Sequence, residues 1–95
     1  MKIKFTKLAQ RDLEYIEEYI FNDNPPAAKR VIWYIIERIE TLLPANPAIG
    51  RPGSVLGTRE LVITKYPYVV PYRVDNGELR ILRVLHTSIK FPQKT

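Results

Sequence analysis

The sequence has no cysteine and a single histidine, His86, among its 95 residues. Without thiols there can be no disulfide, no thiolate nucleophile and no thiolate metal site, a composition typical of cytosolic proteins. One imidazole is also too few for the usual zinc sites built from histidine and cysteine. We therefore expect no metal ion and no other cofactor.

Long hydrophobic runs are missing as well. The basic start of the chain, Met1–Phe5, is followed by no apolar segment of signal-peptide or transmembrane length. Glycine is scarce, with four residues, and the run Gly50–Gly53 is not followed by the helix that a phosphate-binding loop requires. These absences predict a soluble, cytoplasmic protein that does not use the membrane.

The chain has an ordinary globular balance, with 45% hydrophobic and 26% charged residues, and a length that suits one domain, 1–95. Its charge is unevenly divided. Residues 1–48 hold seven Lys/Arg and seven Asp/Glu, whereas residues 49–95 hold eight and three, so the net charge of +5 lies in the second half. This asymmetry suits an acidic partner, either nucleic acid or an acidic protein segment, but a solvated basic face that aids solubility would look the same.

The first half predicts a short strand and a helix. Residues 2–6 alternate between polar and apolar side chains, which is typical of a strand, and Thr6 can cap the helix that follows. Apolar residues recur at helical spacing on one face of that helix, namely Ala9, Leu13, Ile16 and Ile20.

A second helix should begin at Asn24-Pro25, because asparagine is a good N-cap and proline suits the first helical position. It should end near Pro44–Pro47, and its short link to the first helix makes the pair an antiparallel helical hairpin. Its apolar stripe is wider than usual, so the extra surface either faces the sheet or waits for a partner. The stripe contains Ala28, Val31, Ile32, Ile35, Ile39 and Leu42, and is widened by Trp33, Ile36 and Leu43.

The second half predicts a loop rich in proline and glycine and then three antiparallel strands, at about 44–58, 59–64, 66–74 and 79–86 in turn. Asn76-Gly77 accepts the positive φ angles of a type I′ turn, which indicates a hairpin between the last two strands. Pro67 and Pro71 cannot donate hydrogen bonds to a neighbouring strand, so the middle strand should have an unpaired side or a bulge there.

The predicted fold class is therefore α+β, in the order β-α-α-β-β-β, with a helical hairpin packed on one face of a small antiparallel sheet. The last strand should lie in the interior of the sheet, because it is apolar on both faces. The first strand should pair with one of the last three. Helices on one side leave the other face of the sheet open, and we expect that face to carry much of the excess charge.

Candidate chemistry is limited to arginines and tyrosines of the second half: Arg51, Arg59, Arg73, Arg80 and Arg83, with Tyr66, Tyr68 and Tyr72 among them. Such interleaving can bind RNA through phosphate contacts and base stacking. Strand alternation instead predicts that the tyrosines form an aromatic layer under the helices, while Arg73 points to the opposite face. His86 is either a general acid or base or a structural histidine at the edge of the sheet.

The layout and five phrases of the sequence resemble the RelE/ParE superfamily of bacterial type II toxins, over nearly the whole chain. The phrases are Asn24–Ala28, Pro47–Pro52, Gly57–Leu61, Tyr66–Val74 and Ile81–His86. The resemblance implies a toxin that arrests growth and is held inactive by a cognate antitoxin. The antitoxin's acidic C-terminal segment would wrap the toxin in a hetero-oligomeric complex.

Two branches of the superfamily resemble the chain to different degrees. RelE-like members are ribosome-dependent mRNA endoribonucleases, and their basic sheet positions fall on Leu61, Ile63 and Val69, which carry no charge for a phosphate. ParE-like members inhibit DNA gyrase by binding, and they commonly share the Tyr66–Tyr68 and Val84–His86 phrases. The resemblance therefore implies a ParE-like toxin that targets gyrase without catalytic residues, with the nuclease as the alternative.

Such an antitoxin segment is expected to cover the wide apolar face of the second helix or to add to the edge of the sheet, and the excess charge suggests which other residues it meets. Those implied to bind antitoxin or target are Arg51, Arg59, Arg73, Arg80 and Arg83, with Trp33, Ile36, Lys90 and Phe91. If the protein were a nuclease, the chemistry would fall to Arg59, Arg73, Arg83 and His86. The basic tail departs from the family pattern, because Phe91 stands where a tryptophan commonly precedes the proline.

Overall fold

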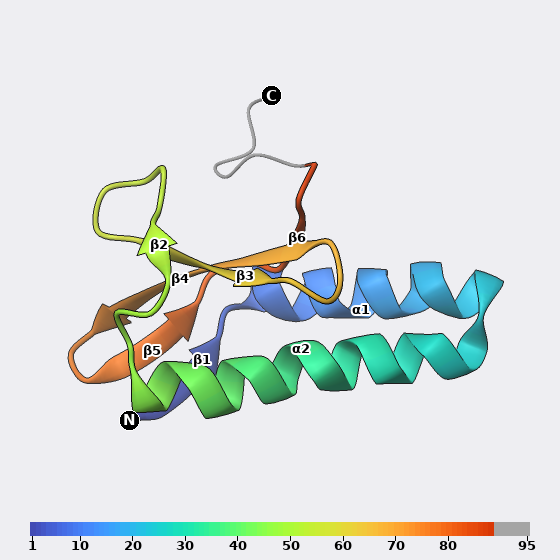
Figure 1. The fold of residues 1–95 in the computed structure, drawn as a ribbon, viewed down its shortest axis with the longest axis horizontal. Coiled ribbons are helices and arrows are strands. Elements are labelled where there is room, and N and C mark those ends of the chain that lie inside the picture. The colour runs from blue at the N-terminus through green and yellow to red at the C-terminus, as the bar shows by residue number, and fades with distance from the viewer. Residues whose placement is uncertain (89–95) are drawn as a thin grey trace.

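Two helices pack on one face of a six-stranded sheet in the computed structural model, which describes residues 1–88 (Figure 1). This is the α+β arrangement predicted from the sequence. The elements are β1 (Lys2–Phe5), α1 (Lys7–Asp23), α2 (Pro25–Ala45), β2 (Arg51–Pro52), β3 (Arg59–Ile63), β4 (Tyr68–Asp75), β5 (Glu78–Ile81) and β6 (Leu85–His86).

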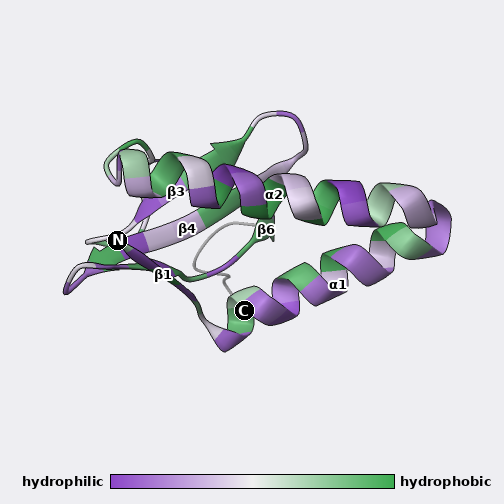
Figure 2. Ribbon diagram, turned by 90° about the horizontal axis from the view of Figure 1, so that it is seen from below, coloured by the Kyte–Doolittle hydropathy of each residue, from purple (hydrophilic) through white to green (hydrophobic). Residues whose placement is uncertain are grey.

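The helices begin where their capping residues predict. The Thr6 hydroxyl accepts a hydrogen bond from the Ala9 N–H at 3.0 Å, and the Asn24 side chain accepts one from Ala27 at 3.3 Å. Pro25 occupies the start of α2, where no N–H is needed. Hydrophilic and hydrophobic residues alternate along both helices in Figure 2, as amphipathic helices require.

The sheet has the order β1-β5-β4-β3-β2, and β6 pairs with β4. The expectation of a purely antiparallel sheet is corrected at one place, because β1 runs parallel to β5. Tight turns force β3, β4 and β5 to alternate in direction. The long connection from β1 through both helices imposes no such constraint. As predicted, the first strand pairs with one of the later ones, and β5 lies in the interior of the sheet.

The strand predicted at 79–86 is divided in two by a bulge. Tyr72 on β4 lies opposite Ile81, whereas Val69 lies opposite Leu85. Two residues of β4 between these pairs therefore face three residues, 82–84, on the other strand. One extra residue on one side is the definition of a β-bulge, which bends the strand and locally interrupts the ladder.

Proline accounts for the position of this bulge. Pro71 has no N–H to donate, but its carbonyl oxygen accepts from the N–H of Leu82 at 2.9 Å and from that of Arg83 at 3.5 Å. The carbonyl oxygen of Pro67 accepts from Thr87 at 2.9 Å. The irregularity predicted from the two prolines is thus confirmed at Pro71.

The β4–β5 hairpin is also confirmed. Asn76 and Gly77 have φ angles of 51° and 76°, which a type I′ turn demands of both central residues. The predicted loop 44–58 differs from expectation in containing the two-residue strand β2, which pairs with the start of β3.

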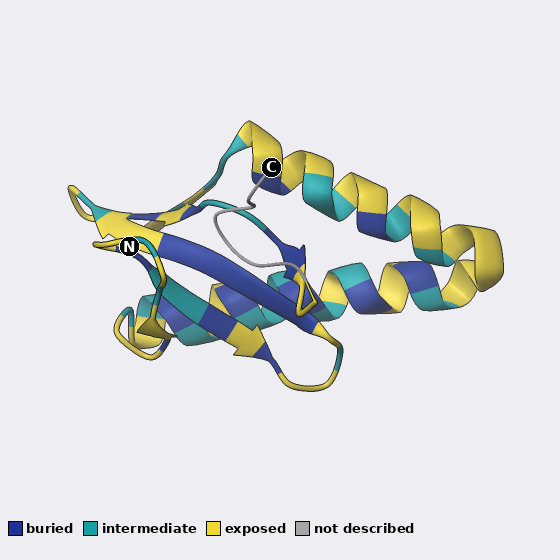
Figure 3. Cartoon of the chain, turned by 90° about the horizontal axis from the view of Figure 1, so that it is seen from above, coloured by how far each residue is buried: buried dark blue, intermediate teal, exposed yellow. Residues whose placement is uncertain are grey.

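The core lies between the helical hairpin and the sheet. Tyr68 and Tyr72 are buried in it, as predicted for an aromatic layer, and Tyr66 packs against it with its ring edge-to-face to Tyr34 at 5.4 Å. Figure 3 shows β4 as buried along most of its length. The tip of the hairpin, where α1 meets α2, projects beyond the sheet (Figure 1). In the part of the chain that the structure describes, no helix is both long and apolar enough to cross a membrane.

Candidate functional site

A groove of about 430 Å³ lies between α1 and β6, at the end of the sheet where β4 begins. Its walls are largely apolar and aromatic, with a few polar groups, which is the usual character of a binding site. The lining residues are Asp12, Tyr15, Ile16, Tyr19, Tyr68, Arg83, Val84, Leu85 and His86.

The helical wall of the groove is formed by two exposed tyrosines. Tyr15 and Tyr19 are four residues apart, so they share one face of α1, and their ring centroids are 6.4 Å apart. They remain 69% and 68% exposed although large aromatic side chains usually lie inside. Ile16, beside them, is buried in the core. The wall therefore offers apolar surface that the described part of the chain does not cover.

The strand wall is formed by Tyr68 and His86, which lie opposite each other on β4 and β6. Their rings meet edge-to-face with centroids 5.7 Å apart. The Nδ1 atom of His86 accepts from the Ser88 backbone N–H at 3.2 Å and lies 2.9 Å from the Ser88 hydroxyl oxygen. Burial away from water raises the pKa of the Tyr68 phenol above 10.0, and the nearby Tyr19 raises it further.

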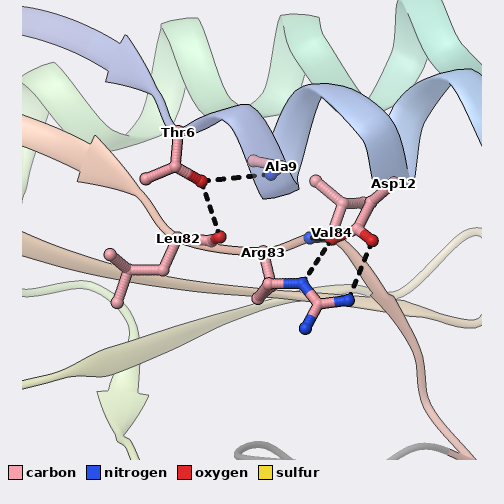
Figure 4. A network of polar contacts seen from close by, with 6 residues as sticks. All are labelled: Thr6, Ala9, Asp12, Leu82, Arg83 and Val84. Carbon is pink, nitrogen blue, oxygen red and sulfur yellow. Dashed lines mark hydrogen bonds and ion pairs between the residues drawn. The ribbon is translucent and has the colours of Figure 1, made fainter.

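Asp12 and Arg83, which also line the groove, form an ion pair (Figure 4). Arg83 donates from Nε to Asp12 Oδ2 at 2.8 Å and from Nη2 to Oδ1 at 3.0 Å, a bidentate geometry. The same carboxylate accepts from the Val84 N–H at 2.9 Å. The hydrogen bond to Asp12 raises the pKa of Arg83, and burial opposes this only in part. Arg83 is thus a charged group whose charge is already compensated.

Arg59 binds the loop that follows α2. It lies opposite Tyr72 on the helix side of the sheet, and its Nη1 donates to the carbonyl oxygens of Gly50 at 2.8 Å and Ala48 at 3.3 Å. The Tyr72 hydroxyl donates to Pro47 O at 2.7 Å and accepts from the Gly50 N–H at 2.9 Å. Together these bonds fix the loop to the sheet.

The other predicted arginines lie on the open face. Arg51 is paired with Glu60 at 3.0 Å, and Arg80 reaches Glu78 at 3.6 Å and Asp75 at 3.9 Å. Arg73 is exposed, and among residues 1–88 no carboxylate pairs with it. Arg73 is therefore the open-face arginine best placed to meet an outside anion.

The sequence-predicted arginines thus divide between two sides of the sheet instead of forming one group. The four candidate nuclease residues do not converge either. Arg73 is on the open face, Arg59 lies against the loop on the helix side, and Arg83 and His86 line the groove. The positions matched to basic residues of nucleases are buried, with Leu61, Ile63 and Val69 being 5%, 3% and 7% exposed.

The remaining predicted contact residues lie elsewhere. Trp33 on α2 is 68% exposed, whereas Ile36 is half-buried. Lys90 and Phe91 lie outside the described residues. Three or more metal-ligating side chains do not come together anywhere in the described range, 1–88.

Sequence reasoning missed Asp12 and the groove itself. Tyr15 and Tyr19 gave a signal, since they sit at helical spacing beside the core stripe. Asp12 gave none, because its partners Arg83 and Val84 are 71 and 72 residues away in sequence.

The model of the ParE toxin of the type II toxin–antitoxin system parDE matches residues 3–91, and the chain belongs to this family. The Sinorhizobium fredii protein Y4kP is 41% identical over 92 residues, covering 97% of this chain and 94% of its own.

Two solved structures share the fold. A chain of the chromosomal ParDE toxin–antitoxin system of P. aeruginosa superposes with a TM-score of 0.84 at 33% identity, covering 90% of this chain and 95% of that one. A chain of the RelBE2 toxin–antitoxin complex of Mycobacterium tuberculosis gives a TM-score of 0.67 at 28% identity, with the same coverage. The protein is accordingly a type II toxin of the ParE/RelE superfamily.

Proposed function

We propose that this toxin inhibits DNA gyrase by binding to it and performs no bond-making or bond-breaking chemistry of its own. One observation carries the proposal: the four residues that the nuclease alternative would use, Arg59, Arg73, Arg83 and His86, do not meet at one site. Arg73 lies on the open face, whereas Arg83 and His86 lie in the groove.

Cleavage of RNA by a metal-free protein requires a base near the ribose 2′-hydroxyl and cations around the phosphate, all within hydrogen-bond reach. Arg83 cannot supply a free cation, because its Nε and Nη2 atoms are engaged by Asp12. Arg59 likewise donates to main-chain carbonyls. The available chemistry therefore supports recognition of a target.

The same proposal includes a cognate antitoxin as the partner that neutralises the toxin, in a hetero-oligomeric complex in the cytoplasm. The groove between α1 and β6 is the surface that suits it, because Tyr15 and Tyr19 offer uncovered aromatic area in a concave site. An acidic antitoxin segment would also meet the net charge of +5 and Arg73, with which no carboxylate among residues 1–88 pairs.

The test is a supercoiling assay with purified gyrase, relaxed plasmid and the toxin at micromolar concentration. We expect supercoiling to stop, and to resume when the antitoxin is added in equimolar amount. Tyr15→Ala and Tyr19→Ala should weaken the antitoxin's effect, while Leu56→Ala, which alters an exposed apolar residue on a distant loop, serves as control. Unchanged supercoiling would reject gyrase as the target and leave the ribosome-dependent endoribonuclease as the function to examine.

A further inference from the structure

We infer that Asp12 is a positioning residue, which holds the bulge at 82–84 and so places β6, the strand wall of the groove. The inference deepens the proposed function, because it rests on the groove being the surface that receives the antitoxin. Asp12 is proposed to affect binding through the shape that it gives the strand wall of the groove, and not through a contact with the partner.

The bulge is attached to the start of α1 by every one of its residues (Figure 4). The carbonyl oxygen of Leu82 accepts from the Thr6 hydroxyl at 2.8 Å. The Arg83 guanidinium and the Val84 N–H both donate to Asp12. Thr6, the N-cap of α1, and Asp12, in its second turn, lie more than 70 positions from the bulge in sequence. Their side chains add to the two hydrogen bonds that the bulge still donates to Pro71 on β4.

The Val84 N–H has a particular need for this acceptor. A bulge leaves an N–H without its normal partner on the neighbouring strand. Val84 is only 2% exposed, so water is poorly placed to satisfy that N–H. A buried N–H without a partner costs free energy comparable to a lost hydrogen bond. The carboxylate of Asp12 removes this cost at 2.9 Å.

The register of β6 follows directly from the bulge. With the bulge in place, His86 lies opposite Tyr68 and Leu85 opposite Val69. A shift of one residue would exchange the faces of a strand's side chains. Leu85, 3% exposed, would then lie opposite Tyr68, and the exposed His86 would leave that face. The shape of the groove depends on the present register.

The environment of the pair distinguishes it from an ordinary surface ion pair. The side chains of Arg83 and Asp12 are 20% and 15% exposed, whereas Arg51 in its pair with Glu60 is 62% exposed. Exposed pairs contribute little because water and salt screen them. A half-buried bidentate pair that also binds a main-chain N–H can instead fix a local conformation.

The first experiment uses the free toxin and measures amide hydrogen exchange by NMR. Asp12→Ala should raise the exchange rate of the Val84 amide by about tenfold and shift the resonances of Leu85 and His86. Asp12→Asn retains an oxygen that can accept from Val84, and Arg83→Gln retains the carboxylate, so both should keep most of the protection. Glu14→Gln removes an exposed carboxylate from the same helix and should change nothing.

This ranking separates positioning from a simple ion-pair role. If Arg83→Gln raises the Val84 exchange rate as much as Asp12→Ala does, the ion pair and not the Asp12–Val84 bond holds the strand, and the inference is overturned. It is overturned equally if Asp12→Ala leaves the exchange rate and the β6 resonances as in the wild type. If Asp12→Ala unfolds, Arg83→Gln is compared with the wild type instead, and a roughly tenfold rise in its Val84 exchange rate would overturn the inference.

The second experiment adds the partner, using as probe the purified protein encoded by the reading frame beside the toxin's. Asp12→Ala should weaken its binding by about tenfold, mirroring the exchange data, and Glu14→Gln should not. Binding by Asp12→Ala equal to that of the wild type, while Tyr15→Ala and Tyr19→Ala bind more weakly, would overturn the inference. If the groove is not the antitoxin site, the result differs. Tyr15→Ala and Tyr19→Ala then bind the antitoxin like the wild type, while the exchange results in the free toxin are unchanged.

Discussion

Arg73 and Arg80 lie directly opposite each other on β4 and β5, so two like charges occupy one cross-strand pair. Lys4 on β1 lies opposite Arg80 on its other side, which extends the row of cations across three strands. Arg80 and Lys4 are compensated by Glu78, but Arg73 has no such partner among residues 1–88. Like charges placed directly opposite in a sheet are destabilising.

Replacing Arg73 should therefore stabilise the free toxin while weakening its complex. Arg73→Thr is expected to raise the free energy of unfolding by about 0.5 kcal/mol, because it removes the repulsion and introduces a good strand former. The same variant should bind the antitoxin less tightly and with a weaker dependence on salt. Denaturant unfolding and titration calorimetry at two ionic strengths measure the two effects. Unchanged salt dependence would show that Arg73 is not part of the interface.

Tyr72 is expected to be the side chain on which the loop after α2 depends most. Tyr72→Phe removes the hydroxyl that binds both Pro47 and Gly50, and leaves two main-chain groups without their partner. The expected loss of unfolding free energy is about 1–3 kcal/mol. Denaturant midpoints compared at equal slope would give the value. Tyr15→Phe, which alters an exposed ring, is the matched control and should lie within about 0.5 kcal/mol of wild type.

Gly50 offers a second test of the same loop. A Cβ atom there would lie 2.6 Å from the Tyr72 hydroxyl oxygen and 2.9 Å from Glu60 O, closer than real side chains allow. Gly50→Ala should therefore destabilise the toxin, by about 1–3 kcal/mol for an overpacked site. Gly57→Ala meets no neighbouring atom but has a φ angle of +83°, so its cost would come from the backbone alone. A Gly50→Ala variant as stable as the wild type would contradict this packing.

The raised pKa of Tyr68 predicts how stability changes in alkaline solution. Its folded-state pKa lies above the 10.0 expected of the unfolded chain, because burial disfavours the phenolate. The stabilising contribution is therefore complete below pH 10.0 and is lost as pH rises through the folded-state pKa. Absorbance at alkaline pH should show a late tyrosine ionisation that is missing in Tyr68→Phe, and the variant's stability should fall less steeply in that range. A wild-type titration identical to that of Tyr68→Phe would contradict this.

Local signals in the sequence were sufficient for much of the fold. Thr6 and Asn24 mark helix starts, Asn76-Gly77 marks the hairpin, and Pro71 marks the bulge, because each acts through its own backbone or its nearest neighbours. No local signal predicts that β1 runs parallel to β5. Two helices lie between these strands in the sequence, so β1 could pair in either direction.

The site was less predictable for a related reason. Arg59 and Arg83 look like free cations in the sequence, but one is engaged by carbonyl oxygens of a loop and the other by a carboxylate 71 residues away. The sequence shows which side chains are charged, but not which groups bind them in the folded protein. Arg73 retained its predicted direction because strand alternation alone determines it.

The most direct test of the central claim, action by binding without chemistry, is to map RNA ends after the toxin is induced in growing cells. We expect growth arrest without new 5′ ends in translated messages, and the same pattern for the His86→Ala and Arg73→Ala variants. Messages cut in phase with codons by the wild type, with 2′,3′-cyclic phosphate ends that disappear in either variant, would contradict it.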